Sequence, residues 1–162
     1  MYKRIVVAFD GSREGRSALR EGALLARRCG AQIYLLAVVA DTPGILVAEG
    51  AHAGAMAHQQ DAYKGVLEEA VNGLKPFGIT LEVKLVRGEP SQQIAIYAKQ
   101  VQGDLVVVGH RKQSFLQRWW SGSTGAYLSD QLSCSLLIAR AVISPEEFRA
   151  EIERMAPAPE PT

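Results

Sequence analysis

The sequence predicts an α/β fold, a single open sheet of five mostly parallel strands with helices on both faces. Two observations lead to this prediction. Apolar stretches typical of strands alternate along the chain with stretches of helical periodicity. The first of these strands, at 5–9, is continuously apolar, as expected for a strand that crossover helices bury on both faces.

The expected elements follow one another in a regular order. They are strands at 5–9, 31–39, 79–86, 104–108 and 135–139, and helices at 13–28, about 53–75, about 91–101, 122 to about 131, and from 145 onward.

Capping residues mark the ends of the first two helices. Ser12 is the expected N-cap of the first helix, and Gly30 follows as its C-terminal stop. Pro76 and Gly78 end the second helix. The stretch at 40–52 has no clear period, so we expect a loop there.

The second half repeats the strand–helix alternation. The third strand alternates apolar and polar residues, and Gly88-Glu89-Pro90 turns the chain into the third helix. The fourth strand is apolar and ends at Gly109. The loop at 109–121 then leads to a helix that Gly122 opens, before the short fifth strand.

The C-terminal residues differ in character from the rest. Ser144 and Pro145 suit the N-cap and first position of a helix, which should pack on the domain or on a partner subunit. The Pro-rich residues 156–162 are expected to be extended or disordered. We therefore expect an α/β domain at 1–141 and an appended helix and tail at 142–162.

Length and composition narrow the class of protein. The chain has 162 residues, which suits one domain, and its formal net charge of +1 implies no nucleic acid or other polyionic partner. No apolar run is long enough for a membrane span, and the early first strand leaves no room for a signal peptide. Cys29 and Cys134 are too few for a disulfide framework, so we expect buried or part-buried thiols and a cytoplasmic location.

Two polar turns at strand ends are the candidate site. Asp10-Gly11-Ser12 follows the first strand, and ligands of open α/β sheets bind beyond such carboxyl ends. After the fourth strand, Gly109 precedes Gly122-Ser123-Thr124 at a helix N-terminus, where free amides suit phosphate. Arg111 and Lys112 add positive charge. The alternative is that Asp10 and Ser12 only cap a helix, and that the second turn is an ordinary glycine turn.

At these motifs the chain resembles the universal stress protein family over about residues 1–140. The resemblance rests on KRIVVAFDGSREGRSAL, QIYLLAVV, GDLVVVGHR and SCSLLIAR in that order. Nucleotide-binding members carry G-x2-G-x9-G-[ST]. Here the motif reads Gly109-x2-Lys112-x9-Gly122-Ser123, so the nine-residue spacing is kept while lysine replaces the middle glycine.

The resemblance implies an adenine nucleotide α-hydrolase-like fold with the sheet order 3-2-1-4-5, and a homodimer that pairs through the last strand. It also implies that the protein binds ATP or another adenine nucleotide, with or without Mg²⁺. The residues that it implies around the nucleotide are Ala8, Phe9, Asp10, Val38, Val108, Gly109, Gly122, Ser123 and Thr124.

The leading hypothesis is a cytoplasmic stress-response protein that senses or regulates through a bound adenine nucleotide. No arrangement of residues supplies a strong catalytic base, so at most slow ATP hydrolysis is expected. The competing hypothesis is a nucleotide-free interaction module, in which Lys112 blocks the site and the dimer or tail engages a protein partner. Replacing Lys112 with glycine distinguishes the two.

Overall fold

The structure is a computed structural model that describes residues 1–40, 52–110 and 128–155. Its strands are β1 (Arg4–Ala8), β2 (Gln32–Ala40), β3 (Leu81–Gly88), β4 (Leu105–Gly109) and β5 (Ser135–Ala139). Its helices are α1 (Arg13–Cys29), α2 (His52–Leu74), the short 3-10 turn η1 (Lys75–Phe77), α3 (Pro90–Gln100), α5 (Leu128–Gln131) and α6 (Pro145–Met155).

The five strands form one sheet in the order β3-β2-β1-β4-β5, with every neighbouring pair parallel. The predicted fold class and strand order are therefore confirmed. β1 lies at the centre, with Val7 opposite Leu35 of β2 and Val107 of β4. Because all strands are parallel, their carboxyl ends meet at one edge of the sheet, where open α/β sheets bind their ligands.

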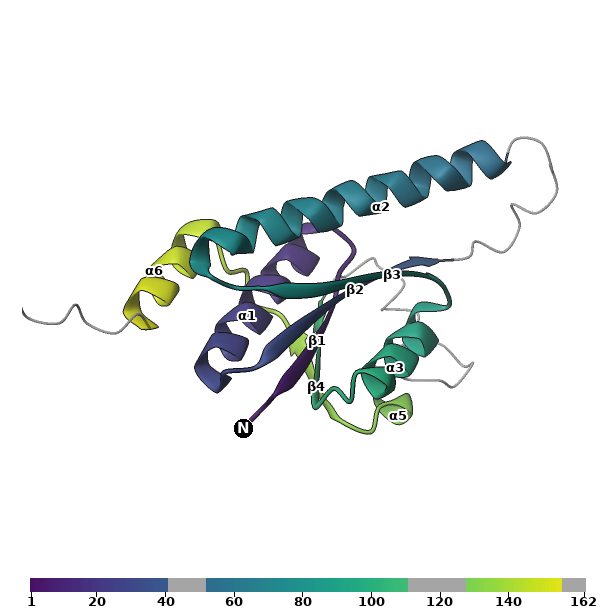
Figure 1. Cartoon of the computed structure of the whole chain (residues 1–162). Helices are drawn as coiled ribbons and strands as arrows, with labels where there is room; N and C mark the ends of the chain where they lie inside the picture. The colour runs from purple at the N-terminus through teal and green to yellow at the C-terminus, as the bar shows by residue number, and fades with distance from the viewer. Residues whose placement is uncertain (41–51, 111–127, 156–162) are drawn as a thin grey trace, which may run out of the picture.

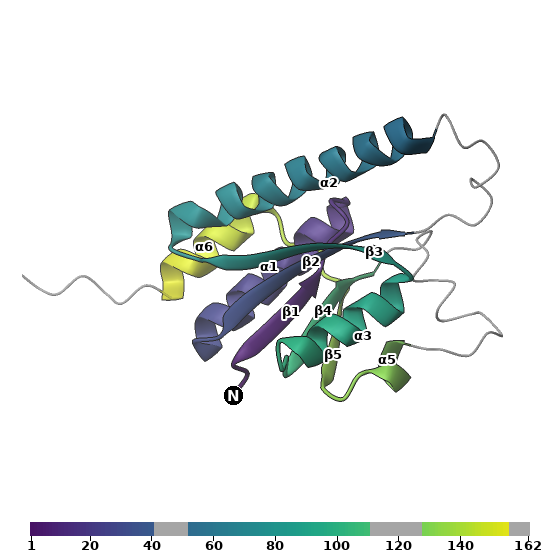
Figure 2. The ribbon, with the colours of Figure 1, turned by 45° about the vertical axis from the view of Figure 1, so that its right-hand side comes forward.

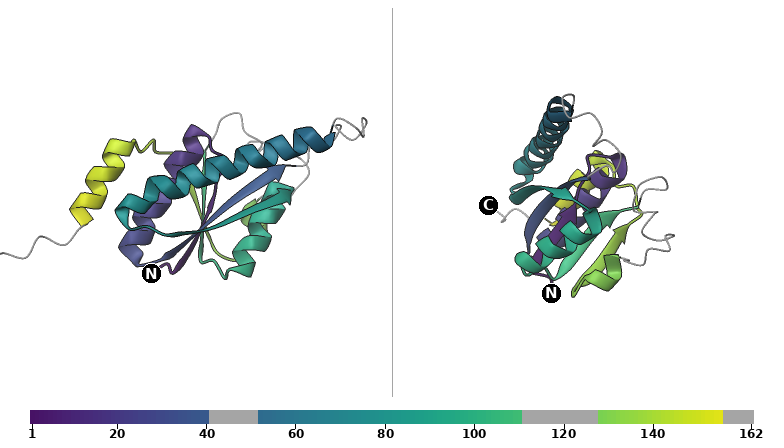
Figure 3. Two further views of the ribbon diagram at one scale, coloured as in Figure 1. Left: turned by 45° about the horizontal axis from the view of Figure 1, so that its top comes forward. Right: turned by 90° about the vertical axis from the view of Figure 1, so that its right-hand side faces the viewer.

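Helices cover both faces of the sheet. Figures 1 and 2 show α1, α2 and α6 on one side, and α3 with α5 on the other. The alternation of side chains along the strands matches this layout, since Ile5 and Val7 join the core under α1 whereas Val6 and Val106 join the core under α3. The two views in Figure 3 show the strands fanned by the usual twist of such a sheet.

The predicted capping residues hold the first and last helices. The Ser12 hydroxyl accepts a hydrogen bond from the Gly15 amide at 3.0 Å, and Gly30 ends α1 in the left-handed conformation with φ 64°. In α6, the Glu147 amide donates to Ser144 Oγ while the Ser144 amide donates to the Glu147 carboxylate. This reciprocal pair is a capping box, which fixes where α6 begins.

The C-terminal helix packs on the domain. Phe148 and Ile152 of α6 are buried in the same core as Leu19 and Ala23 of α1. Of the helix predicted at 122 to about 131, only Leu128–Gln131 lies among the described residues, and the expected loop at 40–52 lies almost wholly outside them. Among the described residues, no helix is long and apolar enough to cross a bilayer.

Candidate functional site

The turn after β1 is held by its own polar side chains. Asp10 Oδ1 accepts hydrogen bonds from the Ser12 amide at 2.9 Å and from the Ser12 hydroxyl at 2.5 Å. The Ser12 hydroxyl in turn caps α1, so the capping role that the sequence suggested is present. Asp10 is nonetheless exposed at the carboxyl edge of the sheet, which keeps this carboxylate within reach of a ligand.

An apolar wall stands beside Asp10. Ala8, Val38 and Val108 come from β1, β2 and β4, and all three contact the core under α3. Val108 is buried, whereas Ala8 and Val38 are only partly covered. The structure thus brings together three predicted site residues from three neighbouring strands, on one face of the sheet and near its carboxyl edge.

Phe9, another predicted site residue, has its side chain on the opposite face. It is only 4% exposed and belongs to the core under α1 and α2. The Phe9 amide still extends the β1–β2 ladder by donating to the Leu36 carbonyl at 2.8 Å. Only the Phe9 backbone is therefore placed next to the apolar wall.

Gly109 ends β4 in close contact with the first turn of α1. A Cβ atom built on Gly109 would lie 2.7 Å from the Glu14 carbonyl oxygen and 3.1 Å from the Gly15 amide nitrogen. Both atoms belong to backbone, so any larger residue would push β4 away from α1. The absence of a side chain at Gly109 therefore allows the end of β4 to lie close to the first turn of α1.

Arg16 ties the turn after β1 to α2. Its Nε donates to the Gly11 carbonyl at 3.1 Å, and its two terminal nitrogens contact the Glu69 carboxylate at 2.8 and 3.1 Å. This pairing with Glu69 raises the pKa of Arg16 and lowers the pKa of Glu69. Sequence reasoning missed this clamp, because nothing local signals a contact between residues 53 positions apart.

α2 also packs directly on the turn. Gly11 has φ 75°, and a Cβ atom there would lie 2.5 Å from Val66 Cγ1. One turn earlier on α2, burial raises the pKa of the half-buried Tyr63, and the nearby Asp10 carboxylate raises it further. Tyr63 is therefore a second residue near the candidate site that the sequence did not reveal.

The phosphate side of the predicted site lies outside the described residues. This applies to Arg111, Lys112, Gly122, Ser123 and Thr124. Among the residues that the structure does describe, no group of three or more His, Cys, Asp or Glu side chains could hold a metal ion. Cys29 and Cys134 are both half-buried, as predicted, and burial followed by the charge of Asp104 raises the pKa of the Cys134 thiol.

Comparison with known proteins decides the family. The model of the universal stress protein family matches residues 1–140. The chain belongs to this family. A universal stress protein A homologue of Haemophilus ducreyi is 31% identical over 128 residues, which cover 76% of this chain and 86% of the relative.

Solved structures of universal stress proteins share the fold. One, determined in complex with cAMP, has a TM-score of 0.62 and 24% identity, with 86% of this chain and 97% of that chain covered. Another, from Arabidopsis thaliana with AMP bound, has a TM-score of 0.59 and 21% identity, with 84% and 90% covered. Both likenesses concern the fold, since the identities are low.

Proposed function

We propose that this universal stress protein binds an adenine nucleotide at the carboxyl edge of its sheet and acts as a cytoplasmic sensor or regulator. The observation that carries the proposal is the convergence of Ala8, Val38 and Val108 beside the exposed Asp10. Two structural relatives have AMP or cAMP bound. The proposal includes ATP among the candidate nucleotides.

The described residues fit the base and ribose of such a ligand. A purine ring has apolar faces, and the partly covered Ala8 and Val38 offer an apolar surface of matching character. A carboxylate accepts several hydrogen bonds at once, so Asp10 can hold ribose hydroxyls while it keeps the Ser12 contacts. Gly122-Ser123-Thr124, with Arg111 and Lys112, would supply the phosphate contacts.

Isothermal titration with ATP, ADP, AMP and cAMP tests this proposal. We expect saturable binding to the folded protein, weakened about tenfold or more in Asp10→Ala, because a hydrogen bond to a charged acceptor contributes roughly 1.5–3 kcal/mol. Asp61→Asn is the matched control, since Asp61 is an exposed acid on α2. Absence of binding at millimolar concentrations of all four nucleotides would refute the proposal.

The alternative is a universal stress protein that works without a nucleotide, through its dimer or its tail. Lys112 favours this alternative, because it replaces the middle glycine of the phosphate motif. Lys112→Gly separates the two cases. A loss of nucleotide affinity would mean that the ammonium group contacts phosphate, whereas a large gain would mean that the natural site is blocked.

A further inference from the structure

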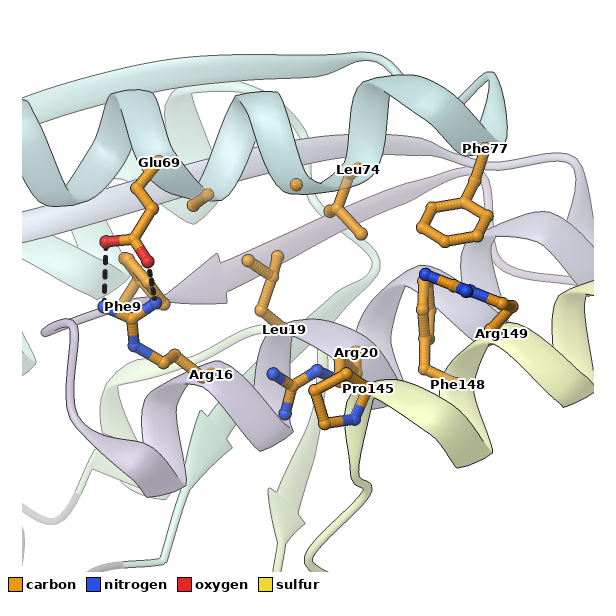
Figure 4. Close-up of a pocket in the computed structure, with 12 residues that line it drawn as sticks. Phe9, Arg16, Leu19, Arg20, Glu69, Leu74, Phe77, Pro145, Phe148 and Arg149 are labelled. Atoms are coloured by element: carbon orange, nitrogen blue, oxygen red, sulfur yellow. Dashed lines mark hydrogen bonds and ion pairs between the residues drawn. The ribbon is translucent and has the colours of Figure 1, made fainter.

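A separate groove lies on the other face of the sheet, between α1, α2 and α6. Its volume is about 280 Å³, and Figure 4 shows α2 along one side with α1 and α6 along the other. The groove is below the usual size range of ligand pockets, roughly 300–1,000 Å³, so a small ligand would fill it.

The interior of the groove is apolar. Leu19 and Leu74 are each 5% exposed, and Phe148 is 3% exposed. Phe77 and Phe148 meet edge to face at one end, with their ring centroids 5.2 Å apart. This end, formed by η1 and α6, offers an aromatic surface for an alkyl chain.

The rim of the groove carries an excess of positive charge. Arg16 is neutralised by Glu69, but neither Arg20 nor Arg149 has a carboxylate within ion-pair distance among the described residues. Burial, and then the charge of Arg16, lowers the pKa of Arg20. The charge of Glu146 raises this pKa in turn, so burial is the main cause of the shift.

Glu146 on α6 offsets part of this positive charge, because its carboxylate interacts electrostatically with Arg149 and Arg20. Glu146 is exposed, and hydrogen bonds to its own backbone amide and to Ser144 are the main causes that lower its pKa. The lining of the groove itself carries three arginines, Arg16, Arg20 and Arg149, and one carboxylate, Glu69, so its charge stays positive. Arg20 uses one terminal nitrogen to hold the Ile143 carbonyl at 2.8 Å, which leaves its other donors for a ligand.

We propose that this groove binds a small amphipathic carboxylate, specifically a medium-chain fatty acid. Its carboxylate lies against Arg20 and Arg149, and its alkyl chain lies along Leu19, Leu74 and the Phe77–Phe148 pair. The complementarity of charge at the rim and of apolar surface inside selects this ligand class over a neutral lipid or a sugar. The site is distinct from the nucleotide site and does not depend on it.

Titration of the full chain with hexanoate, octanoate and decanoate tests the proposal, with all concentrations below micelle formation. Each added methylene that becomes buried should tighten binding about fourfold. Octanamide, which lacks the negative charge, should bind at least tenfold more weakly than octanoate. Affinity that is independent of chain length, or equal affinity for the amide, would overturn the proposal.

A pair of glycine substitutions on α2 locates the site. Gly73 lines the groove, and a Cβ atom built on it meets nothing within 4 Å, so Gly73→Leu begins its side chain in open space there. Gly65 is equally open but lies outside the lining. We expect Gly73→Leu to weaken octanoate binding at least tenfold and Gly65→Leu to leave it unchanged. Equal affinities of the two variants would refute the location.

A pair of arginine substitutions on α6 tests the charge. Arg149 lines the groove, whereas Arg154 pairs with Glu151 at 2.7 Å and does not. Both side chains are exposed, so their replacement by glutamine should preserve the fold. Arg149→Gln should weaken octanoate binding several-fold, with no change in Arg154→Gln. The same affinity in both variants would contradict the proposed carboxylate contact.

Discussion

Arg16 connects three parts of the molecule through one side chain. It belongs to α1, it holds the carbonyl of Gly11 in the turn after β1, and it pairs with Glu69 of α2. The Gly11 contact fixes the backbone beside Asp10, so Arg16 is a positioning residue for the candidate site. A planar guanidinium that makes three directed hydrogen bonds is not replaceable by lysine at this position.

The Arg16–Glu69 pair predicts a specific dependence of stability on pH. The folded-state pKa of Glu69 lies below its ordinary value of 4.5, so its stabilising effect is present above the unfolded-state pKa and lost as the pH falls through the folded-state pKa. Wild type should therefore be more stable than Glu69→Gln at pH 7, and the difference should shrink below pH 4.5. Urea denaturation at several pH values measures it.

A neighbouring glutamate provides the control for this prediction. Glu68 is also exposed on α2 and forms no ion pair among the described residues. Glu68→Gln should show little effect at either pH. A gap between wild type and Glu69→Gln that stays constant from pH 7 to pH 3 would contradict the assigned role.

Gly109 gives the second prediction at the scale of single residues. Gly109→Ala places a methyl group against the backbone of Glu14 and Gly15, so we expect a destabilisation of about 1–3 kcal/mol, typical of overpacking. Gly65→Ala on α2 is the opposite case, because the site is open and alanine favours a helix by roughly 0.5–1 kcal/mol. Denaturant unfolding should show the two shifts with opposite signs, and a neutral Gly109→Ala would disprove the contact.

The helix α6 lies outside the region that the family model matches, yet it packs in the main core of the domain. It follows residue 140, where the match to the family model ends, yet it buries Phe148 and Ile152 in the main core. Its linker is held as well, since Ser17 Oγ donates to the Ala141 carbonyl and accepts from the Ile143 amide, both at 2.7 Å. We propose that residues 142–162 are a segment appended to the domain, and that its helix, α6, stabilises the domain.

Phe148→Ala tests the role of α6. Removing a buried phenylalanine typically costs about 3–5 kcal/mol, and here the edge-to-face contact with Phe77 is lost too. Chemical denaturation should show a single transition at lower denaturant. Phe148→Leu keeps part of the buried volume and should cost less. A stability unchanged in Phe148→Ala would mean that α6 does not pack on α1 in solution.

At the scale of the whole molecule, the sequence predicted the sheet well, whereas the roles of the candidate site residues stay predictions. The features that predicted the sheet are local in the sequence. They are continuous apolar strands such as β1, glycines that end helices such as Gly30, and the alternation of strands and helices. The family resemblance added the strand order and pointed to Ala8, Asp10, Val38 and Val108, which the structure brings to one edge of the sheet.

Other features of the whole molecule depend on contacts between distant segments. The Arg16–Glu69 clamp and the groove between α1, α2 and α6 arise only when helices pack on a shared face. No local pattern indicated that the Phe9 side chain faces this groove while its backbone faces the candidate site. Such pairings depend on how helices cross, which periodicity within one helix does not specify.

We propose that an adenine nucleotide occupies the carboxyl edge of β1, β2 and β4. Backbone amide chemical-shift mapping by ¹H–¹⁵N NMR, during titration with AMP, tests it most directly. We expect saturable shifts concentrated at residues 8–12, at Val38 and at Val108 and Gly109, with none at α6. No shifts at millimolar AMP, or shifts confined to other parts of the protein, would contradict it.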